Sequence, residues 1–94
     1  MARLNKSARG KHRWIGITSD KELSRSKLND TISPILGRSN WRIYDVEHRQ
    51  GITIFILRVS LDEYQNSISK INSSNSLTTL TSSGKIRLVR ERVL

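Results

Sequence analysis

The sequence contains no cysteine, which excludes a disulfide framework and a thiolate zinc site. Two histidines, His12 and His48, are too few to hold a metal cluster. The longest apolar run covers residues 54–57, whereas a membrane-spanning helix needs about 18–20 apolar residues, and the basic start lacks the apolar stretch of a signal peptide. These absences predict a soluble, cytoplasmic protein, because a reducing compartment suits a chain without cysteine.

Catalytic motifs are also missing. The serines are numerous, but none lies in a G-x-S-x-G sequence, and both histidines lie in polar, basic or loop contexts that supply no oriented base. Asp62 and Glu63 fall in the first turn of an expected helix, where the helix dipole favours carboxylates. Asp45 and Glu47 share one face of an expected strand, a pattern more typical of a solvated hairpin than of a metal site. We therefore expect no catalytic residue, metal site or cofactor in this chain.

Positive charge is plentiful and is concentrated at the two ends of the 94-residue chain. Residues 1–13 contain five lysines or arginines and no acid, residues 14–84 contain eight basic and seven acidic side chains, and residues 85–94 carry a net charge of +3. Basic ends beside a balanced middle are typical of segments that contact phosphates, since each neutralised phosphate releases a counterion. A nucleic acid is therefore the expected partner, ahead of an anionic membrane or an acidic protein. The candidate RNA-binding residues are Arg9, Lys11, His12, Arg13, Lys85, Arg87, Arg90 and Arg92.

The length allows one small domain, because a chain of 94 residues buries only about 65% of its extended surface. Residues 1–10 are small, polar and basic, and we expect them to form a flexible tail. Residues 11–94 then form a single α/β domain associated with RNA, which ends on the basic segment 85–94.

Apolar patterns predict the elements in the first half of this domain. Residues 12–18 alternate as a strand does. Ser19 and Glu22 have the spacing of a capping box, and Gly37 can end the helix that follows in a left-handed conformation. Pro34 predicts a kink or a tightened last turn of this helix. The apolar stripe of the helix comprises Leu28, Ile32, Ile35 and Leu36.

Two further strands, residues 41–46 and 52–60, are expected to form a hairpin around the loop 47–51. The second strand is apolar on both faces, which predicts that it is central and covered on both sides. Ser60 and Glu63 again have capping-box spacing and predict a second helix. Its apolar stripe comprises Leu61, Tyr64, Ile68 and Ile71.

The last part of the chain has weaker patterns. Residues 72–83 are mostly Asn, Ser and Thr, which is typical of a linker. Because threonine is β-branched, an edge strand over 77–82 is the preferred interpretation. The apolar spacing of residues 85–94 fits a helix, although Ile86 and Leu88 also fit a strand, and the helix is preferred.

The order strand, helix, strand, strand, helix, strand predicts a ferredoxin-like βαββαβ sandwich, in which a four-stranded antiparallel sheet has both helices on one face. The first and third strands would lie in the middle. The opposite face would be open and apolar, and we expect a protein partner or a second copy of the chain to cover it. Stacking of RNA bases on its aromatic side chains is the alternative. The residues expected at this interface are Trp14, Phe55, Leu57 and Val59.

Several segments, taken together in their order and spacing, resemble one protein family. They are Arg13-Trp14-Ile15 after a basic start, Leu36-Gly37 at the end of the first helix, residues 51–59, and Ser83-Gly84-Lys85-Ile86-Arg87. The family is ribonuclease P protein component two, the small protein subunit of archaeal and eukaryotic ribonuclease P, which is also related to a subunit of ribonuclease MRP. The resemblance covers residues 11–90, and the Ser-Gly-x-Ile-basic element is its most specific part. The short chain is more similar to the archaeal branch.

This resemblance implies a ferredoxin-like fold, a TIM-barrel protein partner and a homodimer within a heterotetramer. It also implies that the chain supports a catalytic RNA, which removes the 5′ leader from precursor tRNA, and that the chain is an endonuclease subunit without catalysis of its own. Mg2+ would serve the RNA-catalysed reaction and would not be bound by this chain. A ribosome-associated or other structural RNA-binding protein is the alternative from a different class. A stand-alone nuclease would need a carboxylate cluster that the sequence lacks.

Overall fold

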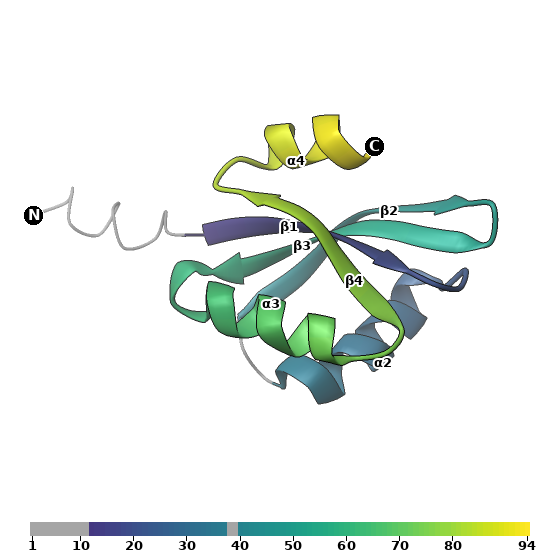
Figure 1. Ribbon diagram of the computed structural model, residues 1–94, viewed down its shortest axis with the longest axis horizontal. Helices are drawn as coiled ribbons and strands as arrows, with labels where there is room; N and C mark the ends of the chain where they lie inside the picture. The colour runs from purple at the N-terminus through teal and green to yellow at the C-terminus, as the bar shows by residue number, and fades with distance from the viewer. Residues whose placement is uncertain (1–11, 38–39) are drawn as a thin grey trace, which may run out of the picture.

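The structure, a computed structural model, describes residues 12–37 and 40–94. These residues form four strands, three α-helices and one short 3-10 helix (Figure 1). In chain order the elements are β1 (His12–Ser19), α2 (Arg25–Leu36), β2 (Trp41–Arg49), β3 (Ile52–Ser60), the 3-10 helix η1 (Leu61–Glu63), α3 (Tyr64–Ser73), β4 (Leu77–Ser83) and α4 (Ile86–Val93). None of the helices within the described ranges is long and apolar enough to cross a bilayer.

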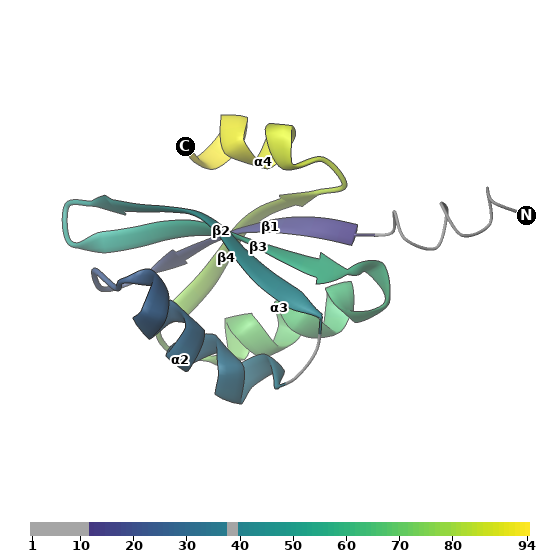
Figure 2. The same ribbon diagram turned by 180° about the vertical axis from the view of Figure 1, so that it is seen from behind.

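The four strands form one antiparallel sheet in the order β2-β3-β1-β4, so the first and third strands occupy the middle as expected. Helices α2 and α3 cover one face of the sheet, and α4 lies on the other (Figure 1 and Figure 2). This arrangement is the predicted ferredoxin-like sandwich with one helix added after its last strand. The edge position of β4 is confirmed, and so is the helix in the last segment.

The main core lies between the sheet and the helices α2 and α3. Side chains alternate along a strand, and directly paired residues share a face, so one set of alternate residues from β1 and β3 points into this core. Ile17 pairs with Phe55 and Ile15 pairs with Leu57, and all four side chains are fully buried. Buried residues of the two helices complete the core: Leu28, Ile32, Leu36 and Ile71.

The expectation that Phe55, Leu57 and Val59 lie on an open face is wrong. Their exposed fractions are 0%, 0% and 1%, and their cluster includes residues of α2 and α3. Trp14 lies on the opposite face, since it pairs with Arg58. A strand that is apolar on both faces does not reveal which face the helices cover, and the prediction chose the wrong one. Phe55, Leu57 and Val59 therefore belong to the core of the chain and not to an interface.

The second face of the sheet has a smaller core beneath α4, which contacts mainly β1 and β4. This core contains Ile54, Ile56, Val89 and Val93. Gly16 lies under the helix, and a Cβ atom at this position would come within 2.9 Å of Val93 Cγ1. Glycine thus lets the short helix approach the sheet closely. The face that the sequence analysis expected to be open is covered in part by the last helix of the chain.

Helix α2 begins later than the capping-box pattern predicts. Ser24 is its N-cap, and the Ser24 hydroxyl accepts a hydrogen bond from the Lys27 amide. Ser19 is the last residue of β1. Its hydroxyl accepts a hydrogen bond from the Lys21 amide and donates one to the Lys21 carbonyl, both at 3.1 Å, and so stabilises a turn. Gly37 ends the helix with a φ of 67°, which glycine adopts at little cost. The start of α2 is therefore corrected, whereas its end agrees with the prediction.

The hairpin of β2 and β3 is tighter than the sequence predicts. Both strands continue to a two-residue turn, Gln50 and Gly51, whose φ angles are 49° and 87°. Positive φ at both central residues gives a turn that matches the twist of the strands. Asp45, with a φ of 51°, lies in a bulge of β2, where the register with β3 shifts between Tyr44 and Glu47.

Strand β4 also contains a bulge. Thr81 pairs with Gly16 and Thr79 pairs with Ile17, which leaves Leu80 between them outside the register. Leu80 is accordingly 50% exposed, although it is apolar. Each outer strand of the sheet is therefore irregular near its middle.

Candidate nucleic-acid interface

The start of β1, which includes Arg13, lies beside the end of β4 and the start of the basic segment 85–94 at one end of the sheet. Trp14, near the start of β1, pairs with Ser83 at the end of β4, from which the chain passes into α4 (Figure 1). Arg13 and Gly84 are neighbours, since a Cβ atom on Gly84 would lie 3.0 Å from Arg13 Nη1. The Ser83 hydroxyl accepts a hydrogen bond from the Lys85 amide at 3.2 Å, which stabilises the bend before α4. We call this place, where β1 and α4 both begin, the junction.

Three of the predicted RNA-binding residues lie at the junction. His12 and Arg13 are half-buried at the start of β1, and Lys85 is exposed directly before α4. Two other predicted residues, Arg9 and Lys11, lie outside the described residues. The structure thus brings together basic residues that are more than seventy residues apart in the sequence, as Arg13 and Lys85 show.

Arg13 has a packing role as well as a charge. Its guanidinium lies over the ring of Tyr64, 5.4 Å from the centroid, and the hydroxyls of Tyr64 and Ser82 are 2.6 Å apart. The buried Nε atom of Arg13 has no hydrogen-bond partner among the described residues. A substitution of Arg13 would disturb this packing as well as remove a charge. Arg13 is therefore a poor position at which to test RNA binding alone.

The four basic residues of the last segment divide into two pairs. Arg90 forms an ion pair with Asp45 of β2 at 2.5 Å, and Arg92 donates two hydrogen bonds to β4 at 3.0 and 3.2 Å. These contacts attach α4 to both outer strands of the sheet. Lys85 and Arg87 are exposed and have no side-chain hydrogen bond or ion pair within the part of the chain that the structure describes. Lys85 and Arg87 are thus available to a ligand, whereas Arg90 and Arg92 already hold the fold.

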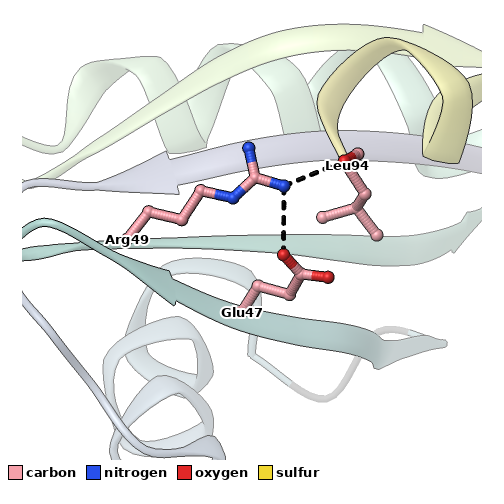
Figure 3. Close-up of polar contacts among 3 residues, drawn as sticks. All are labelled: Glu47, Arg49 and Leu94. Atoms are coloured by element: carbon pink, nitrogen blue, oxygen red, sulfur yellow. Dashed lines mark hydrogen bonds and ion pairs between the residues drawn. The ribbon is translucent and has the colours of Figure 1, made fainter.

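A third arginine holds the end of α4. Arg49, the last residue of β2, donates hydrogen bonds from Nη2 to Glu47 Oε1 at 3.1 Å and to the backbone oxygen of Leu94 at 2.9 Å (Figure 3). Asp45 is bound by Arg90, so each of the two neighbouring carboxylates of β2 contacts an arginine. Residues 12–37 and 40–94 contain no group of three potential metal ligands.

The structure also brings together residues that the sequence analysis missed. Trp14, Arg58 and Arg42 form a row across β1, β3 and β2, because Trp14 pairs with Arg58 and Arg58 pairs with Arg42. All three lie on the sheet face that carries α4. The ring of Tyr44 lies edge-on to Trp14, with centroids 5.1 Å apart, and Arg58 Cζ lies 5.9 Å from the Tyr44 centroid. Alternation along each strand gives the face, but the strand pairing is needed to bring these side chains together.

Within residues 12–37 and 40–94, no acidic side chain neutralises Arg42 or Arg58. Directly opposed residues on paired strands have Cβ atoms about 4.5–5.5 Å apart, and like charges at this spacing destabilise a sheet. Neither arginine has an ion pair with any residue that the structure describes. Arg58 Nη1 reaches only the Tyr44 hydroxyl, at 3.4 Å, and the buried Nε of Arg58 has no partner among the same residues. A bound anion would therefore stabilise this pair.

A hollow of about 350 Å³ lies between α2 and β2. Its lining consists of Arg25, Asn29, Trp41, Arg42 and Ile43. Arg25 Nη1 donates a hydrogen bond of 2.6 Å to the Ile43 carbonyl, and so occupies a backbone acceptor of an outer strand. Since Arg42 belongs to both the hollow and the row, the basic surface continues around the edge of β2.

No family model, curated protein or solved structure matches the chain. The resemblance to ribonuclease P protein component two therefore depends on the short sequence segments alone. The geometry adds one observation about the most specific of them: residues 83–87 lie at the junction, beside the start of β1.

Proposed function

We propose that this chain is an RNA-binding protein subunit of ribonuclease P and supports the catalytic RNA that removes the 5′ leader from precursor tRNA. The observation that carries the proposal is the junction, where Arg13 at the start of β1 lies beside Gly84, directly before the basic segment 85–94. Basic residues that border the junction would form one surface that can follow a single stretch of RNA backbone.

Exposed cations without an acidic partner would make the phosphate contacts. Near the junction and on the sheet face that carries α4, Lys85, Arg87 and Arg42 meet this condition among the described residues. Each phosphate that they neutralise would add roughly 0.7–0.9 to the slope of log affinity against log salt concentration. A positive surface also lowers the repulsion between RNA segments that must lie close together. A protein without catalytic groups can support the active fold of an RNA in this way.

The resemblance of the sequence supports ribonuclease P in particular. By this resemblance the partners would be the catalytic RNA, precursor tRNA and a TIM-barrel protein subunit, with a homodimer within a heterotetramer. The reaction would take place in the cytoplasm, with Mg2+ bound by the RNA. Phe55, Leu57 and Val59 do not contribute to contacts with such partners, because they are buried within the chain.

Reconstitution tests the proposal. The chain is added to an archaeal ribonuclease P RNA, with and without a TIM-barrel subunit, and leader removal is measured at a Mg2+ concentration that barely supports the RNA alone. We expect the chain to raise the rate of cleavage and to release no leader without the RNA. Unchanged rates at every Mg2+ concentration would contradict the proposal. Co-purification with ribosomal RNA would support a ribosome-associated protein instead, and cleavage by the chain alone would indicate a nuclease.

A second measurement isolates the junction. The double variant Lys85→Gln and Arg87→Gln removes two charges and should lower the salt slope of RNA binding by about 1.4–1.8 if both residues contact phosphates. The matched control, Lys27→Gln and Lys70→Gln, changes the net charge equally but lies on α2 and α3. We expect the control to keep the salt slope of the unchanged chain. Equal losses in the two double variants would show that RNA binds without preference for the junction.

A further inference from the structure

We infer that the row Trp14, Arg58 and Arg42 binds an unpaired nucleotide of a single-stranded RNA segment. The base would stack on the Trp14 indole, and its phosphate would lie between the two arginines. The inference rests on the proposed function, because it assigns a local mode of binding to an RNA-binding protein. It selects unpaired RNA, rather than a duplex, as the ligand of this surface.

The sheet holds the three side chains of the row at a fixed spacing. They come from three adjacent strands, which are spaced about 4.8 Å apart, so the row spans roughly 10 Å. The midpoint between the two arginines is one and a half strand spacings, or roughly 7 Å, from Trp14, which is comparable to the distance between the base and the phosphate of one nucleotide. Tyr44 lies on the same face beside the row, where its ring makes a T-shaped contact with Trp14 and lies 5.9 Å from Arg58 Cζ. Arg42 is exposed, whereas Trp14, Tyr44 and Arg58 are half-buried. The row therefore packs against the protein on its inner side and is accessible to a ligand on its outer side.

Charge indicates that the ligand is an anion. Arg42 and Arg58 are directly opposed on β2 and β3, and no described carboxylate pairs with either. An RNA phosphate carries one negative charge and accepts hydrogen bonds from both groups, which are stronger than those between neutral groups. Trp14 also packs against the small core beneath α4, and that packing does not account for the opposed pair of arginines.

Helix α4 adds a third cation beside the row. The ion pair of Arg90 with Asp45 identifies the side of α4 that faces β2. Arg87 precedes Arg90 by three residues, so it lies on the same side of the helix and one turn nearer to the junction. Tyr44 is next to Asp45 in β2, and Arg87 therefore flanks the row. A nucleotide on the row would have its neighbouring phosphate within the reach of Arg87.

The indole favours unpaired RNA over a duplex. Bases in an A-form helix are stacked on one another, and their faces are not available to a protein. Single-stranded RNA offers free base faces, which aromatic side chains in basic surfaces bind with little dependence on sequence. A duplex would offer phosphates to Arg42 and Arg58, but it would offer no free base face to the Trp14 indole.

Fluorine NMR of the full chain labelled with fluorotryptophan tests this inference. The chain has two tryptophans, and Trp41 belongs to the opposite face of the sheet, where it packs against the main core. A short unstructured RNA should shift the Trp14 resonance and leave that of Trp41 in place. A hairpin duplex with the same number of phosphates, and an abasic strand of the same length, should move the Trp14 resonance far less.

Variants test the role of the arginines. Arg42→Gln should weaken binding of the short RNA roughly tenfold, because it removes a charge-assisted contact. Lys27→Gln, which removes an equal charge from the exposed side of α2, should change the affinity by less than about twofold. Thermal melts of both variants confirm that the fold is retained.

The possible outcomes separate this inference from the proposed function. A Trp14 resonance that does not respond to single-stranded RNA, or that responds equally to the abasic strand, overturns the inference. Equal affinities of Arg42→Gln and Lys27→Gln would overturn it as well. If the chain then still binds structured RNA, the proposed function stands without this site. If no RNA binds at all, the proposed function itself is wrong.

Discussion

The two faces of the sheet are covered in different ways. Beneath α2 and α3 the interior is apolar and contains Phe55 and its fully buried neighbours. Beneath α4 the core is small. Gly16 has no side chain, so the helix can lie close to the sheet at this position. Arginines lie around the covered area. One face thus has two helices over a continuous core, and the other has a single eight-residue helix over part of the strands.

This difference separates the stability of the fold from its capacity to bind. Burial of apolar surface is the dominant favourable term in folding, and most of that surface lies on the first face. A helix much shorter than about 12 residues does not persist by itself in water, so α4 depends on its contacts with the sheet. Those contacts include exposed arginines, which contribute little each. Substitutions on the first face should therefore report on folding, and those on the second on helix docking and ligand binding.

The largest effect is expected from Phe55→Ala. It removes a fully buried aromatic ring from the main core and should lower the free energy of unfolding by about 3–5 kcal/mol. The free energy of unfolding of a domain of this kind is roughly 5–15 kcal/mol, so the variant would be close to unfolding. Urea denaturation measures the loss. Leu80→Ala, at a half-exposed bulge, is the control and should change stability by less than about 0.5 kcal/mol. Similar losses in both variants would contradict the described core.

A smaller effect is expected from Gly16→Ala. The added methyl group would lie 2.9 Å from Val93 Cγ1 and 3.2 Å from Val89 Cγ1, so α4 must move away from the sheet. Overpacking of this kind costs about 1–3 kcal/mol. The double variant Gly16→Ala and Val93→Ala should lose less stability than the two single losses combined, because the second change makes room for the first. Additive losses would show that α4 does not rest on Gly16.

The ion pair between Arg90 and Asp45 should contribute less. Arg90→Gln is expected to lower the free energy of unfolding by about 0.2–1 kcal/mol, since the two side chains are 49% and 31% exposed. High salt should reduce this difference, because it screens exposed charges. Asp45→Asn is a suitable partner variant, since asparagine tolerates the positive φ of this position. If the loss in the double variant equals the sum of the single losses, the two residues do not interact.

An effect of similar size but opposite sign is expected from Arg42→Glu. It replaces a like-charged cross-strand pair with an opposite-charged pair and should raise the free energy of unfolding by about 0.2–1 kcal/mol. The same substitution should weaken RNA binding. Thermal melts and RNA titrations of one preparation measure both changes. A loss of stability would show that the Arg42 charge already has a favourable partner in the chain.

Single patterns in the sequence were sufficient where one physical effect dominates. Strand β3 was predicted with its observed bounds, Ile52–Ser60, because its residues are apolar over both faces. The order of the elements then led to the correct topology, since few arrangements of these elements are unstrained. Short polar signals were less dependable. Ser60 has the predicted capping spacing, but it precedes the 3-10 helix η1 and forms no side-chain cap.

Relations between distant segments could not be predicted from the sequence. The basic residues of α4 were identified as candidates. Arg90 pairs with Asp45, which is 45 residues away in the sequence, so no local sequence pattern could indicate this ion pair. The pairing of Arg42 with Arg58 depends on the register of β2 and β3, which shifts again at the bulge. Which face of the sheet α2 and α3 cover also depends on how distant segments pack together, and not on a local sequence pattern. Candidate residues were thus predictable by type, and their grouping was not.

The irregular outer strands have a consequence for the protein at high concentration. Open strand edges normally act as templates for further strands, and bulges or occupied backbone groups prevent such growth. Strand β2 has the bulge at Asp45 and an Ile43 carbonyl bound by Arg25, and β4 has the bulge at Leu80. Many copies gathered on one long polyanion would reach a high local concentration, at which exposed strand edges can meet. These features would keep such neighbours as separate molecules instead of letting them join into a continuous ribbon.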